Sequence, residues 1–310
     1  MHRGTIAGLL LLAASCADHG VAPDTLVLYE AASLAGPMRA VRDTFARRTG
    51  TVVLEEHGGS LELARRITDL HRIPDVVALA DHEVFSEQLR PPATSWYAAF
   101  ARNRMVVAYT ARSRYASEVT ADNWRAILLR PDVVVGRTDP VLAPAGYRAL
   151  LVYRLAETYY HDAGLATRLE ARTPPRLLRG NAADLAALLS AGEMDYIIEY
   201  ESLARAQNFK FVALPAAVDL GDASQAPTYA MASVRVGNGR DSITRHGSPI
   251  LYGVTVPRGA PHSVIGVRFL EFLLGAEAQA MLRAAHVDAL ARPRLYGDSV
   301  PPTLRSLGAP

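Results

Sequence analysis

Small residues cluster at four points where an apolar strand gives way to a helix, and such points can bind an anion. The first backbone N–H groups of a helix lack intrahelical partners and carry a partial positive charge. Small residues let an anion approach that backbone, and neutral donors suit a capture that must be reversed. Four starts could together hold a dianion, although Ser33 and Ser60 are equally typical of ordinary helix caps. The stretches are Ala31-Ala32-Ser33, Gly58-Gly59-Ser60, Pro144-Ala145-Gly146-Tyr147 and Asn181-Ala182-Ala183-Asp184.

A second candidate for chemistry is the acidic end of an apolar strand at residues 195–202. Side chains alternate between the faces of a strand, so Glu199 points away from Tyr200 and in the same direction as Glu201. Carboxylate oxygens are hard ligands, and Glu199 could coordinate a hexavalent metal centre directly. The pattern alone favours a solvated strand end, which is the competing interpretation.

The sequence contains none of the motifs that mark common enzyme classes. It has no G-x-S-x-G elbow, no Walker A loop and no H-E-x-x-H pair, and its nine histidines are scattered. His57 lies beside Glu55 and Glu56 and could bind a metal, but a solvated turn is the simpler interpretation. The formal net charge of +2 is too small to indicate nucleic acid binding. We therefore expect a binding protein that is not an enzyme and has no cofactor.

Residues 1–16 have the pattern of a secretory leader. A short basic start is followed by the apolar stretch 4–14, which is too short to span a bilayer, and then by Ala13-Ala14-Ser15-Cys16. Small residues before a cysteine resemble a lipobox, and Cys16 is the single cysteine of the chain. We expect lipidation of Cys16 to anchor a soluble body to a membrane through a tether at residues 17–24. A cleaved or inert thiol is the alternative.

Beyond the tether, short apolar runs alternate with amphipathic stretches, which predicts two α/β lobes with mostly parallel sheets flanked by helices. We assign residues 25–110 and 251–310 to lobe 1 and residues 111–250 to lobe 2. A ligand cleft between the lobes is expected. The predicted strands are 26–29, 52–54, 75–79, 105–109, 133–135, 196–198 and 250–256, and the main predicted helices begin at Ala32-Ser33 and Ser60 or cover 124–129, 147–160, 185–189 and 264–274.

The ordered motifs of the chain resemble those of the molybdate/tungstate-binding proteins of ABC transporters, specifically the archaeal-type tungstate-binding branch. The resemblance runs from about Thr25 to about Leu282 and is much more specific than any single motif. It is carried by Asp75-Val76-Val77-Ala78 with Ala80-Asp81-His82-Glu83-Val84, by Asn103-Arg104-Met105-Val106-Val107-Ala108-Tyr109-Thr110, by Asp122-Asn123-Trp124, by Gly136-Arg137-Thr138-Asp139-Pro140, by Gly146-Tyr147-Arg148, by Gly192-Glu193-Met194-Asp195-Tyr196, by Leu220-Gly221-Asp222 and by Tyr252-Gly253-Val254-Thr255-Val256-Pro257.

The resemblance implies a type II periplasmic-binding-protein fold whose cleft closes on tungstate or molybdate. It implies a monomer on the periplasmic, extracytoplasmic face of the membrane that hands its anion to ABC permease subunits. It also implies roles for individual residues. Ser33 and Ser60 match the serines that contact the oxyanion through hydroxyl and backbone groups, and Ala145, Ala183 and Asp184 match the contacts from the second lobe. Tyr200 matches a tyrosine of the cleft, and Glu199 matches a carboxylate that coordinates the metal.

One stretch departs from the pattern of the branch. Where the branch usually reads Asp-Pro-Cys-Gly-Tyr-Arg, this chain has Ala143 at the aspartate position, which removes a second carboxylate ligand. Asp139 could replace that carboxylate or could cap a turn. The loss of this carboxylate favours binding of a tetrahedral anion by hydrogen bonds alone, or a preference for a different anion. A receptor for sulfate, phosphate or a small organic anion, and an envelope sensor lipoprotein that kept the fold, are the alternatives.

Overall fold

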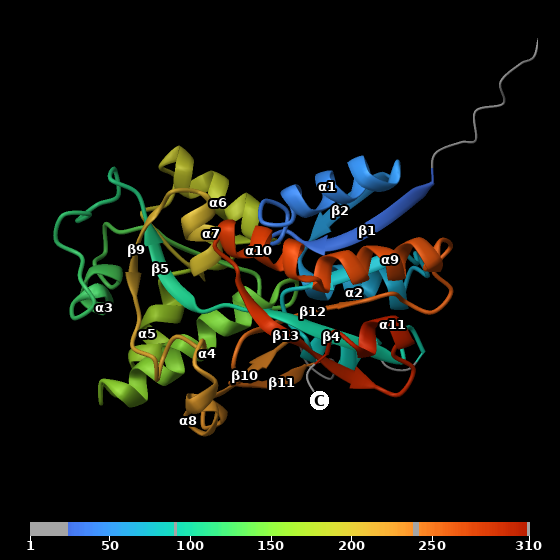
Figure 1. Ribbon diagram of the computed structural model, residues 1–310. Coiled ribbons are helices and arrows are strands. Elements are labelled where there is room, and N and C mark those ends of the chain that lie inside the picture. The colour runs from blue at the N-terminus through green and yellow to red at the C-terminus, as the bar shows by residue number, and fades with distance from the viewer. Residues whose placement is uncertain (1–23, 90–91, 238–241, 309–310) are drawn as a thin grey trace, which may run out of the picture.

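The computed structural model describes residues 24–89, 92–237 and 242–308. The predicted leader, Cys16 and the tether up to residue 23 lie outside these ranges. Within them, no helix has the length and apolar character needed to cross a membrane. The chain forms two lobes that lie side by side, each with a sheet covered by helices (Figure 1).

The first lobe combines elements from both ends of the chain. They are β1 (Thr25–Ala31), α1 (Arg39–Thr49), β2 (Val52–Gly58), α2 (Ser60–Thr68), β3 (Val76–Leu79), the single π-turn η1 (Phe85–Leu89), β4 (Trp96–Arg102), β12 (Leu251–Thr255), α9 (Ser263–Leu274), α10 (Ala276–Ala284), β13 (Asp288–Gly297) and α11 (Pro302–Arg305). The strand order is β13-β4-β12-β3-β1-β2. The central strands β3 and β12 are buried throughout, as expected where both faces of a sheet are covered.

The second lobe is built from the middle of the chain. Its elements are β5 (Met105–Tyr109), α3 (Trp124–Leu128), β6 (Val135–Thr138), α4 (Pro144–Tyr159), α5 (Leu165–Ala171), η2 (Pro175–Leu177), β7 (Leu178–Arg179), α6 (Ala182–Ala191), β8 (Tyr196–Tyr200), α7 (Glu201–Ala206), β9 (Lys210–Ala213), η3 (Ala223–Gln225) and α8 (Ala226–Ala230). The strand order is β7-β6-β8-β5-β9. A separate hairpin of β10 (Ser233–Val236) and β11 (Ile243–His246) follows.

Both sheets are mixed, which corrects the expectation of mostly parallel sheets. β1 is parallel to β2 and β3, but β12 is antiparallel to β3 and β4, and β13 is antiparallel to β4. In the second sheet β6 is parallel to β7 and β8, whereas β5 is antiparallel to β8 and β9. In the first sheet the antiparallel strands β12 and β13 come from the segment that returns after the second lobe.

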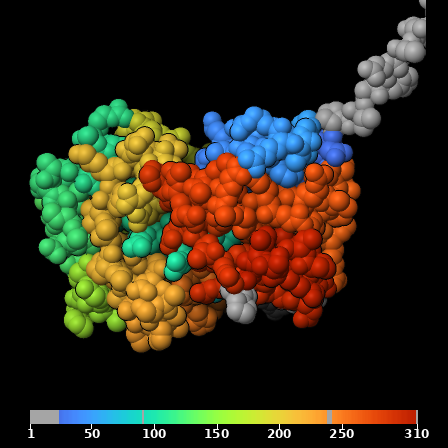
Figure 2. Space-filling view, in the orientation of Figure 1, coloured from blue at the N-terminus to red at the C-terminus, as the bar shows by residue number. Residues whose placement is uncertain are grey.

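The lobe boundary also differs from the prediction. β5 pairs with β8 and β9, so residues 105–109 belong to the second lobe and not to the first. The first crossing therefore lies at Asn103 and Arg104, between β4 and β5. Figure 2 shows the C-terminal segment of the first lobe, in red and orange, lying against the yellow-orange part of the second lobe.

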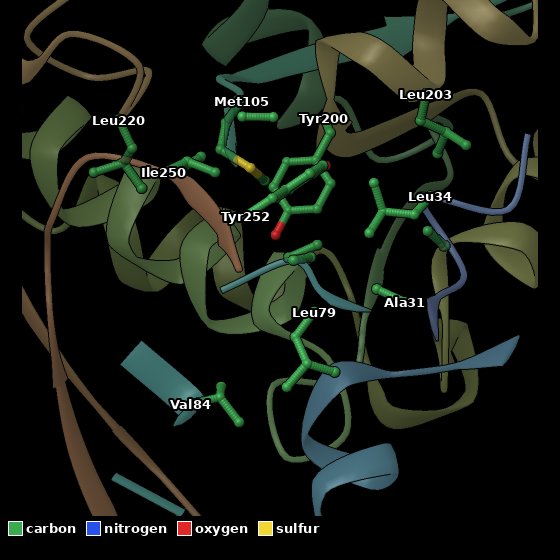
Figure 3. Packing of buried hydrophobic residues seen from close by; sticks show 14 of the residues in the cluster. Ala31, Leu34, Leu79, Val84, Met105, Tyr200, Leu203, Leu220, Ile250 and Tyr252 are labelled. Atoms are coloured by element: carbon green, nitrogen blue, oxygen red, sulfur yellow. The ribbon is translucent and has the colours of Figure 1, made fainter. Parts of the chain in front are cut away.

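The two lobes share an aromatic contact near their junction. Tyr200, at the end of β8, meets Tyr252 of β12 edge to face, with ring centroids 5.8 Å apart and an interplanar angle of 77°. Figure 3 shows these two rings together, with Ala31 and Leu34 of the first lobe close by. Both tyrosines are buried. Ala31, at the end of β1, and Tyr200, at the end of β8, therefore lie close together although they are far apart in the sequence.

Candidate functional site

A small cavity lies between the lobes, where the ends of several strands meet the starts of helices. Its volume is about 10 Å³. No charged side chain lines it, and eight of the lining residues are alanine or glycine, so most of the wall surface is apolar and the polar groups at hand are backbone N–H groups and the hydroxyls of Ser33, Ser60 and Tyr200. The lining residues are Ala31, Ala32, Ser33, Gly58, Gly59, Ser60, Ala80, Ala143, Pro144, Ala145, Ala182 and Tyr200.

The first-lobe wall comes from the neighbouring strands β1 and β2. They run in parallel with Ala31 beside Gly58, so their carboxyl ends stop at the same edge of the sheet. The N–H of Ala32 donates to the carbonyl oxygen of Gly58 at 2.9 Å, which joins the two loops directly. The helix expected to begin at Ala32-Ser33 begins at Arg39, and residues 32–38 form turns. Ser33 therefore lies in a turn and is not a helix cap.

The two predicted serines meet in this wall with different hydrogen bonding. Ser60 is the first residue of α2, and its Oγ accepts the N–H of Ala80 at 3.0 Å, which leaves the Ser60 hydroxyl proton available to a ligand. Ser33 is 3% exposed, and its Oγ has no hydrogen-bond partner. Burial raises the pKa of the neighbouring Tyr252, and the nearby Ser33 hydroxyl partly offsets this increase, so Ser33 lies beside the Tyr252 hydroxyl without forming a hydrogen bond of normal geometry. A buried hydroxyl without a partner is costly, and a bound anion would satisfy it.

The second-lobe wall comes from the starts of α4 and α6. Pro144 is the first residue of α4, so Ala145 carries the first free N–H of that helix, and Ala145 lines the cavity as predicted. At α6, Ala182 lines the cavity, whereas Ala183 and Asp184 are exposed and do not. The N–H of Asp184 donates to Oδ1 of Asn181 at 3.0 Å and serves as part of the helix cap. The predicted ligand contacts Ala183 and Asp184 therefore lie outside the cavity wall, and α6 contributes Ala182 to it.

Tyr200 contributes a hydroxyl from the end of β8. It is 1% exposed, and its oxygen accepts Nη1 of Arg148 at 2.7 Å. Burial raises the pKa of Tyr200 well above its ordinary value. The hydroxyl therefore keeps its proton at any physiological pH and can donate it to an anion.

Glu199 is buried one residue before Tyr200 and does not line the cavity. It is on the other face of β8, and Oε1 accepts the N–H of Tyr200 at 3.0 Å while Oε2 has no partner. Burial raises the pKa of Glu199 to about 8, with partial offset from that hydrogen bond and from Arg148. The expectation of a solvated strand end is therefore wrong, because the side chain is fully buried.

Asp139 does not take the place of the carboxylate missing at Ala143. Its Oδ1 accepts the N–H of Val141 at 2.8 Å, and its carbonyl oxygen accepts the N–H groups of Leu142 and Ala143. It thus caps the turn that leads into α4, and Asp139 is not part of the cavity wall. The cavity wall carries no carboxylate.

His57 belongs to an ion-pair cluster that the sequence did not predict. It lies in β2, and its Nε2 is 2.8 Å from Oε1 of Glu30 and 3.3 Å from Oε2 of Glu55. Arg42 bridges the same two carboxylates at 2.5 Å each. The pKa of His57 is raised, chiefly by its hydrogen bond to Glu30. A guanidinium already neutralises these carboxylates, so a structural role explains the cluster without a metal.

Comparisons with known proteins agree with this geometry. A family model described as bacterial extracellular solute-binding protein matches residues 26–287. An uncharacterized solute-binding protein of Petrotoga mobilis is 40% identical, and the match covers 83% of this chain and 81% of that protein. The molybdate/tungstate-binding protein WtpA of Thermococcus kodakarensis is 34% identical, with 91% of this chain and 87% of WtpA covered.

Two solved structures share the two-lobed architecture. The periplasmic molybdate-binding protein of Azotobacter vinelandii superposes with a TM-score of 0.61 at 16% identity, covering 84% of this chain and 98% of that one. The sulfate-binding protein SubI of Mycobacterium tuberculosis H37Rv superposes with a TM-score of 0.60 at 15% identity, covering 91% and 90%. The expected periplasmic-binding-protein fold is thereby confirmed. The chain belongs to the family of bacterial extracellular solute-binding proteins.

Proposed function

We propose that this protein is the extracytoplasmic receptor of an ABC importer and that it captures molybdate or tungstate. The observation that carries the proposal is the small cavity between the lobes. Its wall offers two serine hydroxyls, a protonated tyrosine hydroxyl and the starts of three helices, and no charged side chain lines it. Neutral donors that converge in a dry site bind a dianion strongly and still allow its release.

The size of the cavity supports a small compact ligand. Its volume of about 10 Å³ is close to what one water molecule requires. A tetrahedral anion carries four oxygens and must push these walls slightly apart, and a larger organic anion must displace them much further. The relative from Thermococcus kodakarensis is described as binding molybdate and tungstate, which are anions of this compact shape.

We propose that hydrogen bonds supply most of the binding, because the cavity wall holds no carboxylate. Glu199 directly precedes the cavity residue Tyr200 and has an oxygen without a partner, but it does not line the cavity, so its proposed role as a direct ligand of tungsten or molybdenum requires the end of β8 to rearrange and the carboxyl to lose its proton when the anion binds. Sulfate is the second candidate. A site without a lining carboxylate binds any tetrahedral dianion by the same donors, and sulfate needs no metal coordination.

The remaining parts of the proposal concern location and partners. Lipidation of Cys16 would hold a monomer on the outer face of the membrane, beside the permease subunits that receive the anion. The family to which the chain belongs is described as extracellular, which supports this location.

Calorimetric titration of the purified protein with tungstate, molybdate, sulfate and phosphate tests the proposed function. Tight binding of tungstate or molybdate without a response to sulfate is the expected result. Preference for sulfate would select the second candidate. Binding of none of the four anions would refute the function as a receptor for small tetrahedral oxyanions.

A further inference from the structure

Asp81 and Arg148 form a buried ion pair beside the cavity, although neither of them lines it. Nη2 of Arg148 lies 3.2 Å from Oδ1 of Asp81, and both side chains are 2% exposed. The hydroxyl of Tyr147 donates to the other carboxylate oxygen of Asp81. Both oxygens of Asp81 are therefore engaged by neighbouring residues of one helix.

The two partners come from different lobes. Asp81 follows β3 in the first lobe, whereas Tyr147 and Arg148 lie in the first two turns of α4 in the second lobe. Every contact between Asp81 and α4 therefore crosses the cleft. Since the cavity is too small to admit an anion as it stands, the lobes must separate for ligand exchange, and these contacts must then break.

Arg148 also touches both walls of the cavity. Its Nη1 donates to the carbonyl oxygen of Ala80 at 2.6 Å and to the hydroxyl oxygen of Tyr200 at 2.7 Å. Ala80 is on the first-lobe wall, where its N–H holds Ser60, and Tyr200 is on the second-lobe wall. Because Arg148 donates to the Tyr200 oxygen, the Tyr200 hydroxyl proton points away from Arg148, and the cavity that Tyr200 lines is one place where it can meet an acceptor.

We propose that Asp81 and Arg148 form a closure clamp, which holds the lobes together over the bound anion and positions the Tyr200 hydroxyl to donate to it. This inference rests on the proposed function of the cavity and adds two positioning residues to it. When the lobes are apart, both charged groups are in water. When the lobes close, both charges are buried, and among the described residues each is the only opposite charge in direct contact with the other, supplemented by hydrogen bonds from Tyr147 and Glu83 to Asp81 and from Arg148 to Ala80 and Tyr200.

Two variants separate this clamp from a simple electrostatic effect of Arg148 on the anion. Arg148→Met removes the ion pair together with its positive charge. Asp81→Asn removes the ion pair but keeps the positive charge of Arg148. A field effect alone predicts that Asp81→Asn tightens tungstate binding, because a negative charge beside a dianion is lost. The clamp predicts that both variants weaken it, by roughly a hundredfold or more for Arg148→Met. Arg154→Met, on the exposed side of the same helix, is the matched control.

The readouts are affinity by calorimetry, dissociation rate by stopped-flow fluorescence and the melting temperature with and without tungstate. We expect faster dissociation, with an association rate close to that of the unmodified protein and a melting temperature that falls much more with bound tungstate than without it. Tighter binding by Asp81→Asn, or the same fall in melting temperature with and without tungstate, would overturn the clamp. The first of these outcomes would indicate a field effect, and the second a purely structural ion pair.

Failure of the proposed function would be recognised separately. If the unmodified protein binds none of the four oxyanions, that function is withdrawn, and X-ray scattering of the ligand-free proteins still tests the clamp. A larger radius of gyration for Arg148→Met than for the unmodified protein supports it. Identical radii refute it.

Discussion

Gly59 and Leu142 approach each other across the cleft so closely that a Cβ atom at Gly59 would overlap the carbonyl oxygen of Leu142. That same oxygen accepts the N–H groups of Leu61 at 3.1 Å and of Glu62 at 3.3 Å, so a carbonyl of the second lobe caps α2 of the first. Nη2 of Arg65 donates to the carbonyl oxygen of Val141 at 2.8 Å. The turn before α4 thus docks directly onto the start of α2 when the lobes are closed.

Gly59→Ala should therefore weaken ligand binding without unfolding either lobe. The backbone at Gly59 has φ −68° and ψ 139°, which any residue adopts, so strain arises only from the contact across the cleft. We expect tungstate affinity to fall by roughly tenfold or more, the usual cost of overpacking. Calorimetry measures the affinity, and thermal unfolding without ligand checks the lobes. Gly36→Ala is the control, because its added Cβ meets nothing within 4 Å.

Ser33→Ala should lower affinity while leaving the ligand-free protein as stable as before or slightly more stable. The Oγ of Ser33 has no partner, so its removal costs the ligand-free protein no hydrogen bond. A hydrogen bond to a charged ligand would be lost, which corresponds to roughly tenfold to a hundredfold in affinity. Ser306→Ala, at an exposed position far from the cavity, should change neither quantity. An unchanged affinity for Ser33→Ala would remove this serine from the site.

Glu199→Ala should reduce tungstate affinity far more than Glu201→Ala. Glu199 is fully buried beside Tyr200, whereas Glu201 is partly exposed and paired with Arg104 and Arg205. If Glu199 coordinates the metal centre, the loss should be large for tungstate and small for sulfate, which has no metal to coordinate. Parallel titrations with the two anions measure this difference. Equal effects of the two substitutions on tungstate affinity would contradict the role of Glu199.

Glu199 should also make the stability of the ligand-free, closed protein depend on pH. Burial raises its pKa from 4.5 to about 8, so the folded protein holds a proton that the unfolded chain releases above about 4.5. Stability from this group is fully present below pH 4.5 and is lost as the pH rises through about 8. One pKa unit corresponds to about 1.4 kcal/mol, so the change amounts to a few kcal/mol. Glu199→Gln should flatten this slope in urea unfolding measured between about pH 5 and about pH 8, and an unchanged slope would assign it to other groups.

Cys16→Ser should release the protein from membranes, because lipidation needs the thiol. Fractionation of cells that express the two forms measures the effect. Persistence of the serine variant in the membrane fraction would show that another part of the chain provides the anchor.

Much of the architecture follows from the sequence, because its strands and helices carry strong local patterns. The strand at 105–109, the helix around Trp124 and the end of α6 at Gly192, where φ is 83°, are as the pattern predicts. β4 and β13 were missed, and both are edge-proximal strands that form by pairing with each other across nearly two hundred residues. Local periodicity carries no information about such pairing. The membership of β5 in the second sheet is hidden for the same reason.

The cavity wall was predicted best where a backbone feature defines it. Ser33, Ser60 and Ala145 line the cavity, and the small residues at strand ends mark such places directly, whereas Tyr200, which also lines it, was expected from the family resemblance. Ala183 and Asp184 were placed too late in the helix, since the pattern of small residues does not reveal which N–H faces inward. Asp81 and Arg148 carry no local signal at all. Their pairing depends on how two lobes meet, and only the three-dimensional arrangement reveals it.

The mixed first sheet has a consequence for the order in which the molecule can be assembled. Synthesis delivers the chain from its N-terminus, and all five strands of the second sheet are available before β12 and β13 exist. β12 separates β3 from β4, so the first sheet cannot close until residue 255 has emerged. The second lobe can therefore mature as a contiguous unit, while β1, β2 and β3 pair with one another and β4 waits for β12 and β13. The anion pocket is among the last features to form, and a nascent or truncated chain cannot trap an ion.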